Sequence, residues 1–147
     1  KNYNLMNETI KLNKKTNIVP VNYGVGAKES TENICPQMAC SNIQKSKNNN
    51  NLETVEIIPI DKYVQDNKIQ VGLIKTDLEG FEQEFLKGAE NTIKTQKPVL
   101  LISICHNEDD FFNIKPIIES WNLGYKFKIV KQTNSIMMET LLIAEVY

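Results

Sequence analysis

Two polar segments of the sequence each follow an apolar run, and together they contain the groups needed for acid–base chemistry. The first runs from Asp77 to Glu82, and the second runs from His106 to Asp110. His106 is the only histidine in the chain. An imidazole gains or loses a proton near neutral pH, and a neighbouring carboxylate can assist it. Asp77 and His106 are therefore a candidate pair for proton transfer.

The same residue types also fit roles outside catalysis. Asp77 could cap a helix that begins near Phe81, with Glu79 and Glu82 favoured by the positive end of the helix dipole. His106 could be an ordinary histidine of a solvated loop. Carboxylates clustered around one histidine could also hold a divalent cation. The sequence alone leaves these roles open.

The cysteines do not favour a disulfide scaffold or a zinc site. Cys35, Cys40 and Cys105 are an odd and sparse set, whereas disulfide-rich domains carry many paired cysteines. The first two have C-x4-C spacing, and adjacent Cys105 and His106 would point to opposite faces of a strand. We therefore expect reduced thiols and no bound metal.

Composition bounds the class of protein. The 147 residues have a mass of 16.8 kDa and suit a single domain over residues 1–147. The chain has 17 lysines, no arginine and 18 acidic residues, which gives a net charge of −1. Because this charge balance is not basic, we expect no nucleic-acid partner. No apolar run has the length of a membrane span and the first residues do not resemble a signal peptide, which predicts a cytoplasmic protein without a membrane partner.

The order of apolar and polar runs predicts an α/β fold. Strands are predicted at 18–23, 54–60, 71–76, 99–105, 125–130 and 139–146, and helices at 4–12, 61–65, 81–93 and 115–121. The polar stretch 28–53 is predicted to be a loop, either a lid or a low-complexity insertion. The continuous apolar run 99–105 is typical of a parallel strand covered on both faces. The last two strands lack a connecting helix and should be antiparallel neighbours.

This architecture would place the two polar segments side by side. Ligands of open α/β sheets bind beyond the carboxyl ends of the parallel strands. If strands 71–76 and 99–105 are neighbours, the backbones at Asp77 and His106 lie about 5 Å apart, which is the spacing between strands.

The stretch from Ile74 to Ala89 reads I-K-T-D-L-E-G-F-E-Q-E-F-L-K-G-A. It resembles the signature I-K-x-D-x-E-G-x-E-x-x-x-L-x-G-A of the FkbM family of S-adenosylmethionine-dependent methyltransferases, and every fixed position matches. Further similarity lies in the segment 7–13, in Ile60-Asp61, in Pro98 with the strand that ends at His106, in Gly124-Tyr125 and in Glu139-Thr140.

The resemblance implies a Rossmann-like class I methyltransferase sheet, mostly parallel with an antiparallel C-terminal edge pair. It implies S-adenosylmethionine as cofactor and a hydroxyl acceptor on a sugar or another small metabolite. The residues that it assigns to catalysis are Asp77, His106 and Glu79, with Asp77 near the transferred methyl group and His106 as the base. Those assigned to the cofactor are Asp77, Tyr23 and Gly24. Those assigned to the substrate are Glu82 and Asn107.

The resemblance covers the C-terminal two thirds of such a catalytic domain. Nothing before Tyr3 matches the glycine-rich turn and the acidic residue that follow the family's first two strands. We therefore expect a sheet without those two strands, inactive by itself, with an unpaired central edge. Unpaired apolar edges associate, so we expect a homodimer across this edge or a third strand that fills the gap. The alternative function is a non-catalytic remnant or interaction module.

Overall fold

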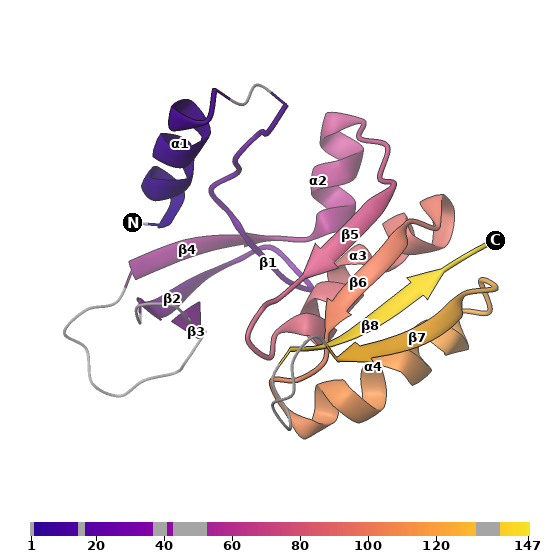
Figure 1. Cartoon of the computed structure of the whole chain (residues 1–147). Helices are drawn as coiled ribbons and strands as arrows, with labels where there is room; N and C mark the ends of the chain where they lie inside the picture. The colour runs from indigo at the N-terminus through magenta and orange to yellow at the C-terminus, as the bar shows by residue number, and fades with distance from the viewer. Residues whose placement is uncertain (1, 15–16, 37–40, 43–52, 132–138) are drawn as a thin grey trace.

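The structure is a computed structural model that describes residues 2–14, 17–36, 41–42, 53–131 and 139–147, with backbone alone at 34–36 and 41–42 (Figure 1). This part of the chain forms two four-stranded sheets and four helices, as the α/β prediction expected. The helices are α1 (Asn2–Leu12), α2 (Ile60–Asn67), α3 (Glu82–Gln96) and α4 (Glu108–Ser120). The strands are β1 (Gly24–Val25), β2 (Ser30–Pro36), β3 (Ser41–Asn42), β4 (Glu53–Ile58), β5 (Leu73–Thr76), β6 (Val99–Ser103), β7 (Lys126–Lys131) and β8 (Thr140–Glu145).

The C-terminal sheet has the order β5-β6-β8-β7. β5 and β6 are parallel, with Thr76 opposite Ile102, while β8 runs antiparallel to both β6 and β7. The predicted antiparallel pairing of the last two strands is therefore confirmed. The parallel register brings the carboxyl ends of β5 and β6 together, and this juxtaposition positions the candidate site.

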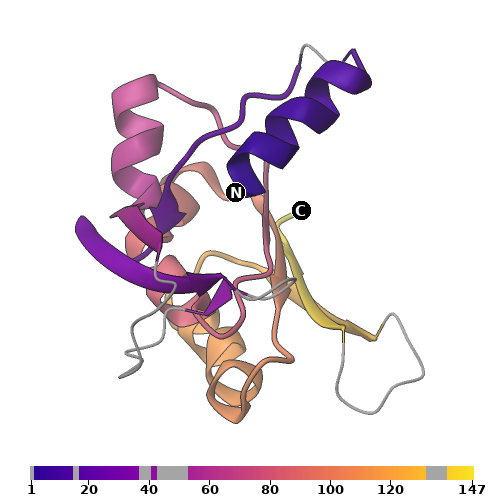
Figure 2. The same cartoon turned by 90° about the vertical axis from the view of Figure 1, so that its left-hand side faces the viewer.

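The main core lies between this sheet and the helices α3 and α4, which cover the same face (Figure 2). Leu100 and Ile102 of β6 are fully buried in that core, whereas Val99 and Leu101 on the opposite face are only half-buried. Ser103, on the same face as Val99 and Leu101, is buried, so the second face of β6 is covered less completely than the first. The apolar run reflects one deeply buried face and one partly exposed face.

The second sheet corrects the prediction of a loop over 28–53. β2 lies inside that stretch and pairs antiparallel with β4, from Ser30 opposite Ile57 to Ile34 opposite Glu53. Thr31 and Asn33 are exposed, so the strand is held by main-chain pairing and not by an apolar face. The polar composition of this stretch therefore did not indicate that it contains strand β2. Residues 37–40 and 43–52 of the expected loop lie outside the described part.

The strand predicted at 18–23 is also wrong. The structure assigns no strand there, and pairing with β4 begins only at Gly24, opposite Ile57. Val19 keeps 80% of its surface exposed. An apolar alternating run becomes a strand only when a neighbour accepts its hydrogen bonds, and none of the described strands pairs with 18–23.

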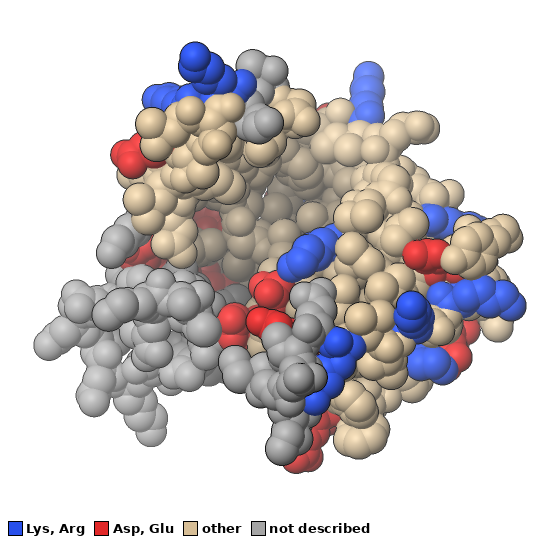
Figure 3. All heavy atoms as spheres, viewed as in Figure 1, with Lys and Arg blue, Asp and Glu red and all other residues tan. Residues whose placement is uncertain are grey.

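Several apolar side chains near this segment face solvent. Helix α1 has no buried residue, and Leu12 on α1 and Leu73 on β5 are exposed by 82% and 55%. Among the described strands β5 pairs with β6 alone, so its other edge is open. The surface is hollowed between α1 and the side of the molecule that carries α2 (Figure 3). None of the described helices is both long and apolar enough to cross a membrane.

Helix α3 joins the two sheets through a close contact between glycines. A Cβ atom added to Gly88 would lie 2.0 Å from the backbone oxygen of Gly26 and 3.3 Å from Cα of Pro59. Both of these neighbours are backbone atoms that cannot rotate away. Gly88, the second glycine of the motif Ile74–Ala89, therefore allows α3 to lie against the end of β1.

Replacing Gly88 with alanine should lower the free energy of unfolding by about 3 kcal/mol, because overpacking against backbone cannot be relieved by a rotamer change. Gly72→Ala is the matched control, since no heavy atom lies within 4 Å of its added Cβ. That variant should stay within about 0.5 kcal/mol of the parent. Urea unfolding followed by circular dichroism measures both, and equal midpoints for the two variants would contradict the packing argument.

The open edge of β5 leads us to expect self-association of the 147-residue chain. Sedimentation velocity over a range of concentrations should show a dimer or a larger species, because an exposed strand edge offers unpaired N–H and C=O groups. Leu73→Lys places a charge beside that edge at an already exposed position and should shift the distribution to monomer. A parent chain that stays monomeric at high concentration would show that the edge does not mediate assembly.

Candidate functional site

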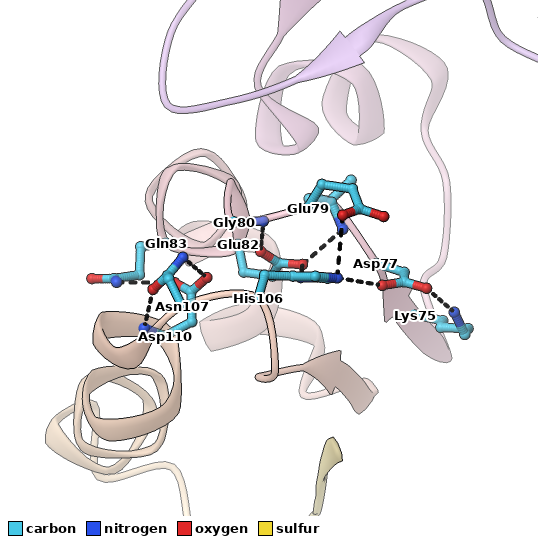
Figure 4. Close-up of polar contacts among 10 residues, drawn as sticks. Lys75, Asp77, Glu79, Gly80, Glu82, Gln83, His106, Asn107 and Asp110 are labelled. Atoms are coloured by element: carbon cyan, nitrogen blue, oxygen red, sulfur yellow. Dashed lines mark hydrogen bonds and ion pairs between the residues drawn. The ribbon is translucent and has the colours of Figure 1, made fainter. Parts of the chain in front are cut away.

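The imidazole of His106 lies among three carboxylates at the carboxyl ends of β5 and β6 (Figure 4). Its Nε2 lies 3.2 Å from Oδ1 of Asp77 and 3.8 Å from Oε2 of Glu79. Its Nδ1 lies 3.2 Å from Oε1 of Glu82. The predicted approach of Asp77 to His106 is therefore present, while the catalytic roles of both residues stay predictions.

The segment between β5 and α3 forms a tight turn that orients the carboxylates of Asp77, Glu79 and Glu82. Glu79 and Gly80 both have left-handed backbone angles, with φ of 55° and 94°. Glu82 closes the turn, because its Oε1 accepts a hydrogen bond from Leu78 N (2.7 Å) and its Oε2 accepts one from Gly80 N (3.0 Å). A side chain at position 80 would also meet Asn107 Nδ2 at 2.9 Å. Glycine is thus required here both for its backbone angles and for space.

This turn excludes the alternative in which Asp77 caps α3. The N-cap residue of α3 is Phe81, and no side chain makes a capping hydrogen bond there. The carboxylate of Asp77 points away from the helix, toward His106 Nε2 and toward Lys75 Nζ at 3.9 Å. The backbone reversal at Glu79 and Gly80 separates Asp77 from the first turn of α3.

Burial increases across the site from Asp77 to Glu82. The side chain of Asp77 is 55% exposed, that of Glu79 34% and that of His106 16%, while Glu82 has no exposed surface. The Nε2 side of the imidazole therefore faces two accessible carboxylates. The Nδ1 side faces a buried carboxylate held by backbone N–H groups.

The structure shows how Glu82 is held, while its expected role toward a substrate stays a prediction. Its side chain has no exposed surface, and both of its oxygens accept hydrogen bonds from backbone N–H groups. Sequence reasoning identified Glu82 as part of the site but did not separate a buried glutamate from an exposed one. The signal that could have done so is its position in the first turn of α3, on the helix face of buried Phe85 and Leu86.

Asn107 was also expected to contact substrate. Its side-chain amide forms hydrogen bonds with Asp110 in the first turn of α4. Its Oδ1 accepts a hydrogen bond from Asp110 N, and its Nδ2 donates one to Asp110 Oδ2, both at 2.7 Å. This N-cap starts α4 at Glu108, seven residues before the predicted start at Lys115, and places Pro116 inside the helix. The pattern Asn-x-x-Asp was the available sequence signal for this start.

Asp110 and Gln83 belong to the site architecture and were not identified from the sequence. Asp110 is 1% exposed, and its Oδ1 accepts a hydrogen bond from Gln83 Nε2 at 3.0 Å. This contact joins the first turn of α3 to the first turn of α4. The segment that carries His106 is therefore fixed at its helical end, while β6 fixes the other end.

Tyr23 and Gly24, expected on the cofactor side, make no hydrogen bond or ion pair with the His106 cluster in the described part of the chain. Tyr23 is 47% exposed at the end of the extended segment. A Cβ on Gly24 would lie 2.5 Å from Cδ1 of Ile57, so packing against β4 explains this glycine. Their roles toward a cofactor stay predictions.

The cluster also contains potential metal ligands. One ligand atom each from Asp77, Glu82 and His106 lie within 4.8 Å of one another. Both oxygens of Glu82 already accept backbone hydrogen bonds, so fewer of its lone pairs are free for a cation. Cys105 is a free, half-buried thiol, and the side chains of Cys35 and Cys40 lie outside the described residues.

Comparison with family models identifies a Methyltransferase FkbM domain over residues 1–127. The chain belongs to the FkbM methyltransferase family. The motif Ile74–Ala89 lies inside the matched region and forms β5, the turn and the first half of α3. The resemblance that the sequence predicted is therefore confirmed, and methyl transfer is the chemistry of this family.

A solved structure shares the FkbM fold. The chain is similar to the crystal structure of methyltransferase FkbM from Methylobacillus flagellatus KT, with a TM-score of 0.72 and 23% identity. The match covers 95% of this chain and 32% of that protein, so this chain spans about a third of the length of its structural relative. Comparison with curated protein sequences gives no match.

Asn107→Ala should lower the free energy of unfolding by about 1 to 2 kcal/mol, because it removes the N-cap of α4 and an amide partner of buried Asp110. Asn113→Ala is the control, since Asn113 is an exposed residue of the same helix and should change stability by less than about 0.5 kcal/mol. Thermal unfolding measures both variants. Equal losses would show that the cap does not stabilise α4.

Proposed function

We propose that this chain forms part of an S-adenosylmethionine-dependent methyltransferase that methylates a hydroxyl group of a sugar or another small metabolite. The observation that carries the proposal is the position of His106 at the carboxyl ends of β5 and β6, with Nε2 beside the exposed carboxylate of Asp77 and Nδ1 beside the buried carboxylate of Glu82. The activity belongs to the complete domain, because the chain covers 32% of its structural relative.

His106 fits the role of general base. A hydroxyl group must lose its proton when its oxygen is methylated, and a neutral imidazole is a suitable acceptor at neutral pH. Nε2 lies beside the exposed carboxylates of Asp77 and Glu79, and this is the side from which an acceptor hydroxyl would approach. Asp77 and Glu79 lie near the same nitrogen and can bind the further hydroxyl groups of a sugar.

The charges of the site support an uncharged acceptor. Asp77 and Glu79 are accessible carboxylates beside His106, and Glu108 and Asp109 are exposed at the start of α4. This acidic surface repels phosphate and carboxylate groups. The chain also has no arginine with which to bind them. The hydroxyl groups of a neutral polyhydroxylated compound can donate hydrogen bonds to these carboxylates.

The residues of this chain also fit the cofactor by charge. S-adenosylmethionine supplies an electrophilic methyl group on a positively charged sulfonium. Asp77, which the family resemblance places near that methyl group, presents an exposed carboxylate suited to a cation. The exposed ring of Tyr23 is available to stack against the adenine side, and Gly24 would contribute backbone groups.

We also assign the C-terminal sheet to the Rossmann-like class I arrangement. The support is the parallel β5–β6 pair with the candidate site at its carboxyl ends, together with an antiparallel β8 between β6 and β7. The open edge of β5 is where this assignment requires further strands, which another part of the domain would provide.

In the complete FkbM domain, His106→Ala should lower kcat by about 100-fold or more while the affinity for S-adenosylmethionine hardly changes, because the variant removes only the proton acceptor. Asp77→Asn should lower kcat and raise KM, because it weakens binding as well as chemistry. Methyl transfer to a panel of sugars and other hydroxyl compounds, measured by mass spectrometry, gives both values.

Asn113→Ala, on the exposed face of α4, is the control and should keep the parental turnover. Near-parental turnover of His106→Ala would remove this histidine from the mechanism. A complete domain that binds no S-adenosylmethionine and methylates no member of the panel would favour the alternative of a non-catalytic module.

A further inference from the structure

We propose that Glu82 is a positioning residue that holds the proton of neutral His106 on Nδ1, so that Nε2 is the basic nitrogen presented to the acceptor. The catalytic consequence rests on the proposed function, but the protonation pattern of the ring does not. Free histidine in water prefers the opposite form, with the proton on Nε2. The proposal therefore states that the fold reverses an intrinsic preference.

The first support is the geometry of the acceptor atom. Oε1 of Glu82 lies 3.2 Å from Nδ1 and also accepts the hydrogen bond from Leu78 N. A carboxylate oxygen accepts hydrogen bonds and donates none. Nδ1 can therefore pair with Glu82 only as an N–H donor. Since a neutral imidazole carries one proton, Nε2 is then left with its lone pair.

The second support is the contrast between the two carboxylates that compete for the ring. Asp77 lies as close to Nε2 as Glu82 lies to Nδ1, but its side chain is 55% exposed and Glu82 is fully buried. Water competes for Asp77 and screens its charge, whereas a hydrogen bond to a buried carboxylate is electrostatically stronger. The backbone N–H groups of Leu78 and Gly80 also fix Glu82, while Asp77 has only a distant lysine partner.

The arrangement explains why carboxylates lie at both ring nitrogens. In the neutral ring the Nε2 lone pair faces the oxygens of Asp77 and Glu79, an unfavourable contact unless a proton donor lies between them. An acceptor hydroxyl is such a donor. When the hydroxyl oxygen forms its bond to the methyl carbon, the carbon–sulfur bond of S-adenosylmethionine would break, and the thioether S-adenosylhomocysteine would leave with the electron pair on sulfur. The hydroxyl proton would pass to Nε2, and the resulting imidazolium would donate to Glu82 from Nδ1 and to Asp77 from Nε2.

The test uses the fact that the chain contains a single histidine. In a 15N-labelled sample of the 147-residue chain, long-range proton–nitrogen correlation spectra show one imidazole, whose protonated and unprotonated nitrogens are readily distinguished. At a pH where the same signals show a neutral ring, Nδ1 should carry the proton. A proton on Nε2 in the parent chain overturns the proposal.

Two variants separate the roles of the carboxylates. Asp77→Asn should leave the proton on Nδ1, and a shift of the proton to Nε2 in this variant would overturn the proposal. Glu82→Met has a similar shape and no oxygen, so its ring should move toward the pattern of free histidine. Retention of the parental pattern in a folded Glu82→Met chain would equally overturn it. If Glu82→Met does not fold, the parent chain and Asp77→Asn still decide the question.

A kinetic measurement connects the ring to catalysis. In the complete domain, Glu82→Met should lower kcat by about 100-fold with little change in KM, because substrate binding at Nε2 is kept while the orientation of the base is lost. If the Nδ1 proton is found but the complete domain methylates no hydroxyl compound, the proposed function fails and the positioning role stands. If methylation is found with the proton on Nε2, the positioning role fails alone.

Discussion

The buried carboxylate of Glu82 is the interaction on which the candidate site depends. It binds the backbone N–H groups of Leu78 and Gly80 and faces Nδ1 of His106. One side chain thus closes the turn after β5, begins the first turn of α3 and contacts the residue that follows β6. A buried carboxylate is costly without partners, and here backbone and imidazole supply them. The geometry of the turn and the orientation of the imidazole are therefore coupled.

The elements that could be predicted from the sequence are those with a clear apolar pattern that also form a strand–helix–strand unit with parallel strands. The runs that became β5, α3 and β6 were identified, and with them the approach of Asp77 to His106. The sequence failed where backbone hydrogen bonds decide the structure. β2 is polar and is stabilised by pairing with β4, and 18–23 is apolar but pairs with none of the described strands.

The functional residues show a similar limit. Glu82 and Asn107 were recognised as members of the site, but their roles depend on burial and on side-chain orientation, which a motif does not contain. Asp110 and Gln83 were missed, because a hydrogen bond between the first turns of two helices appears only when both helices are placed. The family motif identifies the residues that matter, and the contacts show what each of them does.

The contact between Gly88 and Gly26 also has a mechanical consequence. The backbone of α3 touches the backbone at Gly26 directly. No layer of side chains lies between them that could deform when one of them moves. A displacement of the segment 24–26 would therefore press on the backbone of α3 at Gly88, which five residues of the same helix separate from Glu82. Helix α3 thereby connects the second sheet, which it contacts at Gly88, with the imidazole, which it contacts through Glu82.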